Sequence, residues 1–297
     1  MTVPVFDAFV AIDWSGARGS YKGISVARCS RGSGAPRLVI PKGRYWTRRE
    51  IADWLAAELE KDQRLLIGFD FAFSFPFEEN LGYFGGRAAR TKDIFSLWDF
   101  IEERCGDEAD FGCANFVKHP DLAPLFWTEG PRPHAWIERK RSVEFVCAEF
   151  TKTWPETLYK LLHSKQVGKA SITGIRVLNA VRKRVFDHVA VWPFEAVNKS
   201  AFVEIYPTIF RKLATRSTAK LKTKSQLDGA LAHFSSKPMP GGSDATLSDH
   251  DTDALISAAG LRVLAATAES WAPRDIAQTR IQREGWIFGV GQGRTLS

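Results

Sequence analysis

Hydrophobic residues in this chain form short apolar runs near both ends, and several of the runs finish on a carboxylate. Residues 8–13 are apolar up to Asp13, and residues 64–70 repeat the pattern up to Asp70. An apolar run of this length predicts a strand buried on both faces of a sheet. Residues 21–29 and 37–40 add two further short strands after glycine-containing turns.

Between the third and fourth of these strands the period changes to that of a helix. Thr47 and Glu50 have the spacing of a capping box, and Ile51, Leu55 and Leu59 fall on one helical face together with Trp54. Three strands, a helix and a fourth strand predict a mixed sheet with a crossover connection.

The pattern is looser over residues 77–187, where helices are expected at 94–104, 153–162 and 171–185. This interval is too long for a simple loop, so we expect a mainly helical or irregular subdomain inserted into a single domain that spans residues 1–297. Regular runs return afterwards. They predict strands at 188–194 and 201–207, a helix at 225–234, a helix at 249–265 and a strand or hairpin arm at 284–291.

The helix at 249–265 begins with acids and continues with small and apolar residues. Ser248 has the position of an N-cap and Asp251 that of its capping partner. Helical spacing places His250, Asp253 and Ser257 on one side. The small residues of the helix body predict close packing on a sheet, and they are Ala254, Ala258 and Gly260.

Composition indicates a soluble globular chain, because 44% of the 297 residues are hydrophobic and 25% are charged. No apolar run approaches the ~20 residues that a membrane span needs, so we expect no membrane association. The N-terminus lacks a secretory pattern, and the four cysteines have neither zinc-ligand spacing nor the density of a disulfide framework. A cytoplasmic protein with reduced cysteines is the expectation.

The net charge of +7 is unevenly distributed. Residues 131–224 contain 19 Lys and Arg and 7 Asp and Glu, a balance of +12, whereas the rest of the chain balances at −5. The densest basic segment, residues 211–224, contains no acid and suits either contact with a nucleic-acid backbone or an ordinary solvated face. Its candidate nucleic-acid-binding residues are Arg211, Lys212, Arg216, Lys220, Lys222 and Lys224.

Carboxylates at the strand ends are the strongest candidates for chemistry. Ends of neighbouring parallel strands lie about 4.8 Å apart, so Asp13 and Asp70 can share one site. Glu204 and Asp253 would bring the total to four acids, which repel one another unless cations or protons are bound. Mg²⁺ or Mn²⁺ suits such oxygen ligands, and two ions about 4 Å apart can hydrolyse a phosphodiester. His250 or Asp251 would assist by ligation or proton transfer.

Structural roles remain open for each of these residues. Asp13 and Asp70 could cap the loops that follow them, and Asp253 could interact favourably with the dipole at the start of its helix. Glu204 could pair with an arginine of the basic segment. Capping explains His250 and Asp251 equally well. Two tryptophans of the inserted interval, Trp127 and Trp136, suit packing better than stacking on bases.

Four motifs carry a resemblance to a known family: AFVAIDWSG, LLIGFDFAFSFP, FVEIYPTIF and DHDTDALISA, in that order. They resemble the family catalogued as domain of unknown function 429, described as predicted nucleases of the ribonuclease H-like fold. The last motif is also similar to the end of Holliday-junction resolvases. The resemblance covers residues 8–76 and 188–290. It implies an α/β fold with a mixed five-stranded sheet flanked by helices. Asp13, Asp70 and Asp253 would be metal ligands, with Glu204 a fourth.

The leading hypothesis is therefore a metal-dependent nuclease for DNA or RNA. A second hypothesis is phosphotransfer, because the Asp-Trp-Ser-Gly turn at residues 13–16 also resembles the first phosphate loop of actin-like ATPases and sugar kinases. Those enzymes hold the nucleotide between two such domains, for which this chain is short. A third hypothesis is a module that binds nucleic acid or protein and keeps the fold without catalysis.

Overall fold

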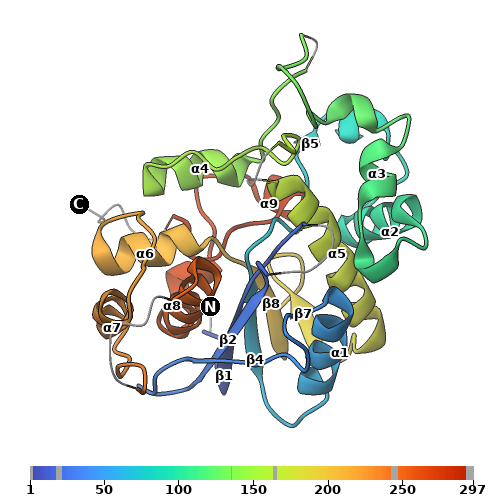
Figure 1. The fold of residues 1–297 in the computed structure, drawn as a ribbon. Coiled ribbons are helices and arrows are strands. Elements are labelled where there is room, and N and C mark those ends of the chain that lie inside the picture. The colour runs from blue at the N-terminus through green and yellow to red at the C-terminus, as the bar shows by residue number, and fades with distance from the viewer. Residues whose placement is uncertain (1–2, 18–21, 135, 163–165, 242–246, 292–297) are drawn as a thin grey trace.

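Six strands form one mixed sheet in the order β3-β2-β1-β4-β8-β7, with helices on both faces (Figure 1). The structure is a computed structural model that describes residues 3–17, 22–134, 136–162, 166–241 and 247–291. The strands of this sheet are β1 (Ala8–Asp13), β2 (Ser25–Ser30), β3 (Arg37–Leu38), β4 (Leu65–Phe69), β7 (Val189–Val191) and β8 (Ser200–Glu204). A separate two-stranded sheet contains β5 (Phe77–Glu78) and β6 (Gly82–Tyr83).

The first four strands form the expected hairpin, third strand and crossover connection. β1 and β2 form an antiparallel pair, whereas β1, β4, β8 and β7 run parallel to their neighbours. The crossover from β3 to β4 contains α1 (Arg48–Leu59), which Thr47 caps by accepting a hydrogen bond from the Glu50 amide at 3.0 Å. The sheet has six strands instead of the expected five, because both apolar runs after His188 enter it.

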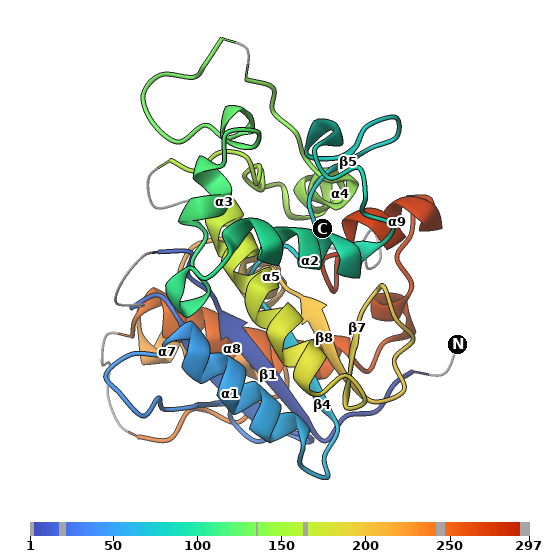
Figure 2. The same ribbon diagram turned by 90° about the vertical axis from the view of Figure 1, so that its right-hand side faces the viewer.

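One face of the sheet is covered by α1, α2 (Ile94–Cys105) and α5 (Val167–Arg184), as Figure 2 shows. Ile172 and Ile175 of α5 belong to the same buried core as Val10 and Ile67 of the sheet. The C-terminal part of the expected insert therefore belongs to the layer that packs on the sheet. The remaining elements of the interval, α3 (Ala114–Lys118), α4 (Ser142–Thr151) and the β5-β6 hairpin, lie above the ends of the strands (Figures 1 and 2).

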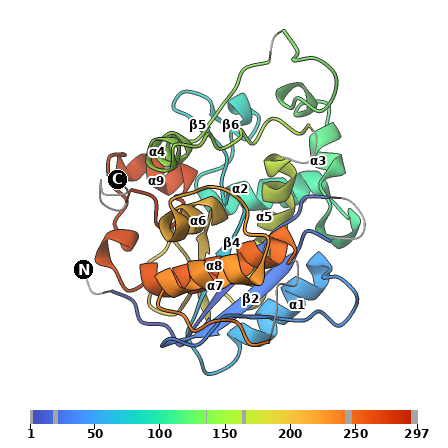
Figure 3. The same cartoon turned by 60° about the vertical axis from the view of Figure 1, so that its left-hand side comes forward.

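The opposite face is covered by α8 (Asp249–Leu264), with α6 (Pro207–Thr215) and α7 (Lys224–His233) beside it (Figure 3). Ser248 caps α8 as expected, since its hydroxyl accepts a hydrogen bond from the Asp251 amide at 3.1 Å. The helix lies very near the sheet. A Cβ atom at Gly68 of β4 would come within 2.8 Å of Leu261 Cδ1 on α8. The close approach of α8 therefore requires glycine at this position of the central strand.

The small residues of α8 serve two different contacts. Ala258 lies against the sheet, where its carbonyl accepts a hydrogen bond from the Cys29 thiol of β2 at 3.3 Å. Gly260 instead lies against α6, because a Cβ atom there would be 2.2 Å from Cδ1 of Phe210. The expectation of close packing on the sheet is confirmed for Ala258, whereas Gly260 permits the contact between two helices.

Two expected elements are absent from the described chain. Residues 153–162 form no helix. Pro155 lacks a donor there, and residues 159–161 hydrogen-bond to Trp127 instead. Residues 284–291 form no strand either: Glu284 ends a helix, Ile287 makes an isolated parallel bridge to Glu204, and residues 288–291 form turns. Gly285, Gly289 and Gly291 all have positive φ angles, which interrupt an extended conformation. The other helical elements are α9 (Gln278–Glu284) and the 3₁₀ turns Phe84–Gly86, Ala109–Phe111, Ala123–Leu125 and Ala268–Trp271.

All four cysteines are buried and reduced, in agreement with the sequence prediction. No helix in the described part of the chain combines the length and apolar character needed to cross a membrane.

Two glycines inside helices provide a matched test of the packing between α6 and α8. We expect Gly260→Ala to lower the free energy of unfolding by about 1–3 kcal/mol, because the new methyl group overlaps the Phe210 ring. Gly229→Ala in α7 is the control, since nothing lies within 4 Å of its added Cβ. Alanine there should raise stability by about 0.5–1 kcal/mol through helix propensity alone. Urea denaturation measures both changes, and an equal gain from both substitutions would contradict the close contact.

Candidate functional site

Asp13 is the last residue of β1, and Asp70 directly follows β4, the neighbouring strand of the sheet. The two strands are parallel and in register, and the Asp70 amide donates to the Ile12 carbonyl at 3.0 Å. Alternation along a strand puts Asp13 on the face of Ala11, and Asp70 on the face of Gly68. Gly68 faces α8, so both carboxylates are directed to the side of the sheet that α8 covers.

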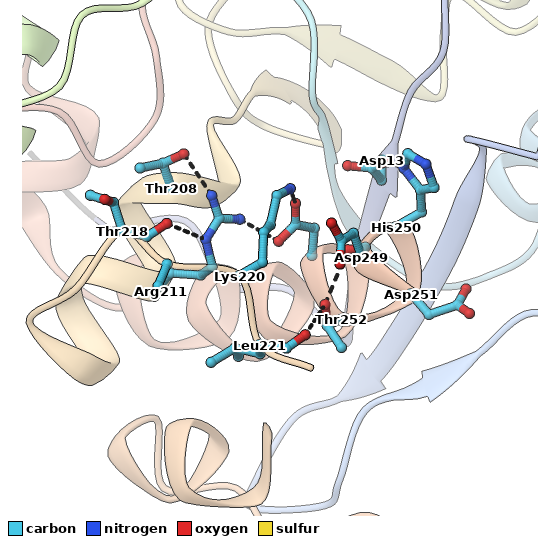
Figure 4. A network of polar contacts seen from close by, with 12 residues as sticks. Asp13, Thr208, Arg211, Thr218, Lys220, Leu221, Asp249, His250, Asp251 and Thr252 are labelled. Atoms are coloured by element: carbon cyan, nitrogen blue, oxygen red, sulfur yellow. Dashed lines mark hydrogen bonds and ion pairs between the residues drawn. The ribbon is translucent and has the colours of Figure 1, made fainter. Parts of the chain in front are cut away.

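The first turns of α8 bring His250 and Asp253 to the same place. His250 Nδ1 is hydrogen-bonded to Asp13 Oδ2 at 2.6 Å, although 237 positions separate them in the chain. Asp13 and Asp253 are 5% and 2% exposed, whereas the His250 side chain is 47% exposed. Figure 4 shows Asp13 and His250 side by side above the start of the helix. The predicted shared face of His250 and Asp253 is thus the face that meets the strand ends.

The three aspartates are close enough to influence one another's ionisation. Burial raises the pKa of Asp70 well above its ordinary range, and the negative charges of Asp13 and Asp253 raise it further. Burial also raises the pKa of Asp13; the hydrogen bond from His250 lowers it in part, and Asp253 again raises it. The same hydrogen bond raises the pKa of His250. Mutual repulsion and loss of solvent therefore act together on this cluster.

Two cations hold Asp253. Arg211 Nη1 donates to one of its carboxylate oxygens and Lys220 Nζ to the other. Arg211 is 4% exposed and also donates to the Thr208 hydroxyl at 2.9 Å and to the Thr218 carbonyl at 3.2 Å. The charge of Lys220 also lowers the pKa of both Asp13 and Asp70, although burial keeps both pKa values above the ordinary one.

Asp70 and Ser257 are the polar groups of this region that lack a partner. No described residue hydrogen-bonds the Asp70 carboxylate, which is half-buried at the end of β4. The Ser257 hydroxyl, one turn beyond Asp253 on the same side of α8, is fully buried without a hydrogen bond. Buried polar groups are nearly always satisfied, so unpaired ones at a candidate site are candidates for contact with water or a ligand.

Asp251 is placed elsewhere. Its carboxylate accepts hydrogen bonds from the hydroxyls of Ser25 and Ser248, both at 2.7 Å. Figure 4 shows its side chain directed away from Asp13. These contacts attach the start of α8 to β2, which is a structural role, and the capping alternative describes Asp251 better than the catalytic one.

Glu204 lies on the other face of the sheet. Its partner in β4 is Phe69, not Asp70, so alternation directs Glu204 away from α8. Arg141 donates to both of its carboxylate oxygens, at 2.5 Å and 2.8 Å, and the Phe73 amide donates at 3.1 Å. The expectation that an arginine would pair with Glu204 is met by Arg141, which precedes α4 and lies outside the basic segment. Glu204 is thus separated from the three aspartates.

Arg141 is the centre of a buried ionic cluster that sequence reasoning missed. It also donates to Glu144 at 2.7 Å and to the Glu284 carbonyl at 3.0 Å, and it is 1% exposed. The cluster joins β8, α4 and α9 through residues that are 60 or more positions apart. Glu144 at the third position after Arg141 was the one local signal, because arginine and glutamate at this spacing often pair.

The basic segment is largely neutralised by the protein's own groups. Arg211 and Lys220 bind Asp253, Lys222 binds Asp249, and Lys224 binds Asp228 at 2.6 Å. Lys212 donates to the Thr151 carbonyl at 2.6 Å. Within the described ranges Arg216 is the one member of the six whose side chain has no ionic or hydrogen-bonding partner. Most of the segment therefore does not form a free track for phosphates.

Trp127 and Trp136 pack against each other with ring centroids 5.5 Å apart, and Trp136 is 7% exposed. The packing interpretation of these two residues agrees with the structure.

Metal ligation is not preformed in this arrangement of side chains. Among the residues that the structure describes, no three histidines, cysteines or acids surround a point suited to a metal ion. The donor set itself suits a hard cation, because Asp13, Asp70 and Asp253 supply carboxylate oxygens and Asp70 is unpaired. A metal ion at Asp253 would either share the two carboxylate oxygens with Arg211 and Lys220 or displace one of these cations.

Comparisons of the chain with protein-family models, with curated proteins and with solved structures found no match.

The effect of substituting Asp70 on the free energy of unfolding can distinguish a ligand from a structural acid. The folded pKa of Asp70 is raised, so its ionisation destabilises the fold as the pH rises from about 4. We expect Asp70→Asn to raise the free energy of unfolding by about 1 kcal/mol at pH 8 without metal, and to have no effect below pH 4. Glu204→Gln should instead cost about 3 kcal/mol, because it leaves Arg141 buried and unpaired. Urea denaturation in the presence of a chelator measures both free energies of unfolding. If both substitutions destabilise the protein, Asp70 is a structural acid.

The Asp13–His250 pair gives a second prediction. Because the pKa of His250 is raised, the pair stabilises the fold fully below about pH 6.5, and this stabilisation is lost as the pH rises through the folded pKa. Asp13→Asn should shift the His250 titration toward lower pH. Proton NMR of the imidazole Cε1–H signal in metal-free protein measures the shift, with exposed His188 as an internal reference. An unchanged His250 titration would show that Asp13 does not control its protonation.

Proposed function

We propose that this chain is a metal-dependent phosphodiesterase that acts on nucleic acid, with Asp13, Asp70 and Asp253 as the metal ligands. The observation that carries the proposal is that the Asp70 carboxylate lies near two other carboxylates and has no hydrogen-bonding partner among the described residues. The two other carboxylates repel it, and its pKa is raised well above the usual range. An acid kept in such a place is costly to the fold unless a cation binds there during function.

Hard divalent cations are the partners that this donor set fits, which supports Mg²⁺ or Mn²⁺ as cofactor. Such ions would supply charge stabilisation of a phosphodiester and a more acidic attacking water. The number of ions is proposed as two from the chemistry of phosphodiester hydrolysis. Glu204 and Asp251 are not part of the proposed ligand set, since Arg141 and two serine hydroxyls hold them elsewhere.

His250 is the proposed proton carrier. Asp13 binds its Nδ1, so the ring is held in one orientation while Nε2 remains for exchange with water or a leaving oxygen. Its half-exposed side chain lies between solvent and the buried carboxylates, which suits this role. The room for the ring depends on Gly23, because a Cβ there would lie 3.3 Å from His250 Nε2.

The placement of the acids supports a ribonuclease H-like fold and the resemblance to domain of unknown function 429. In that resemblance the acids stand at the ends of two strands and in the first turns of a late helix. Asp13, Asp70 and Asp253 occupy the ends of β1 and β4 and the second turn of α8. Nucleic acid is proposed as substrate from the same resemblance and from the +12 balance of residues 131–224.

Phosphotransfer has less support. The enzymes with a comparable phosphate loop hold the nucleotide between two domains, whereas the described strands form one large sheet and one two-stranded hairpin. A binding module without catalysis would need no unpaired carboxylate at the end of β4.

Cleavage of labelled single- and double-stranded DNA and RNA in Mn²⁺ or Mg²⁺ tests the proposal. We expect metal-dependent cleavage that Asp70→Asn reduces at least 100-fold, because the substitution removes the unpaired ligand. His250→Ala should reduce the rate by about 10²–10⁴-fold, the range of a lost general acid or base.

Asp62→Asn is the control, since this exposed acid lies in the loop before β4. Equal inactivity of the wild-type protein and Asp70→Asn on every substrate would reject the nuclease. Cleavage that does not depend on added metal would reject the proposed site.

A further inference from the structure

Lys220 occupies the position in the acid cluster that a bound cation would be expected to share. Its ammonium group binds Asp253 directly. Asp253 lies three residues after His250, which binds Asp13, at the edge of the sheet where β1 and β4 end. A single flexible side chain thus supplies positive charge to one proposed ligand at the place where the other two lie.

The two cations on Asp253 are held very differently. The Arg211 side chain is 5% exposed and its guanidinium also contacts Thr208 and Thr218, so it is fixed within α6 and the loop that follows. The Lys220 side chain is 41% exposed, and Asp253 is its one hydrogen-bonding partner among the described residues. Lys220 lies in the irregular stretch between α6 and α7, where no helix restrains its backbone.

Electrostatics make Lys220 an alternative to a divalent cation. The carboxylates of Asp13, Asp70 and Asp253 together have more negative charge than Arg211 and Lys220 have positive charge, and a divalent ion supplies more compensation than one ammonium group. The two cannot both approach the same oxygens of Asp253 without repelling each other. Of the two resident cations, the one with a single contact and a solvent-exposed stem leaves at the lower cost.

We propose that Lys220 is a built-in substitute cation, which holds the acid cluster together in the metal-free protein and withdraws when a divalent ion binds. The withdrawn ammonium then lies at the mouth of the site, on a flexible stem, and is free to contact a phosphate oxygen of the substrate. Lys220 is therefore a positioning residue that couples metal binding to substrate binding. This inference rests on the proposed metal-dependent function and deepens it.

Calorimetric titration of metal-free protein with Mn²⁺ alone tests the exchange. We expect Lys220→Met to bind Mn²⁺ about tenfold more tightly than the wild-type protein, because the ion no longer has to displace an ammonium group. The substitution should also lower the melting temperature of the metal-free protein, whereas Lys220→Arg should retain the wild-type affinity within a few-fold. Lys222→Met is the matched control, since Lys222 binds Asp249 at the exposed start of α8.

A second measurement uses the wild-type protein and does not depend on a variant's folding. Reductive methylation followed by mass spectrometry reports how readily each lysine amine reacts. Mn²⁺ should increase the labelling rate of Lys220 several-fold and leave that of Lys222 unchanged.

The outcomes separate this inference from the proposed function. If Mn²⁺ binds the wild-type protein but not Asp70→Asn, and Lys220→Met binds it no more tightly, the metal site stands and the role of Lys220 is rejected. If neither the wild-type protein nor Lys220→Met binds Mn²⁺, the proposed function fails as well. Tighter binding by Lys220→Met together with metal-dependent labelling supports the exchange.

Discussion

Electrostatic repulsion among three carboxylates with little exposure to solvent is the constraint on which the rest of the site depends. Asp13, Asp70 and Asp253 are placed together by parts of the chain that are far apart in sequence. The charges of Asp13 and Asp253 raise the pKa of Asp70, and that of Asp253 raises the pKa of Asp13. The groups that compensate this repulsion are unevenly distributed among the three acids. Asp253 has two cations and Asp13 has an imidazole, whereas Asp70 has no direct partner in the described structure.

The position of the three carboxylates is determined by the backbone geometry of the sheet and of α8. The in-register parallel pairing of β1 and β4 puts the ends of both strands at one edge, and alternation directs Asp13 and Asp70 to one face. Gly68 then allows α8 to lie close enough for its second turn to reach them. The acid cluster is therefore a consequence of sheet register and of one missing side chain in a central strand.

The sequence predicted the parts of this arrangement that depend on local patterns. Apolar runs located β1 and β4, and the caps Thr47 and Ser248 located the starts of α1 and α8. The face of Glu204 could not be predicted, because it depends on which residue of β4 lies beside it. A register shifted by one residue would have turned Glu204 toward α8. Arg141 was also beyond prediction, since its partners come from distant elements that only tertiary packing brings together.

The basic segment shows why charge content alone is weak evidence for a partner. Residues 211–224 contain no acid, yet five of their six cations contact groups of the same chain. Four of them bind acids of α8 or α7, and Lys212 binds a backbone carbonyl. A polyanion could engage these cations only by replacing the protein's own acceptors. Replacement is easiest where the acceptor gains another cation in exchange. Asp253 of α8, which binds Arg211 and Lys220, is the acceptor for which a divalent ion would offer that exchange. Under the proposed function, binding of a nucleic-acid backbone and binding of a divalent ion would be one coupled equilibrium, because each would release the group that the other needs.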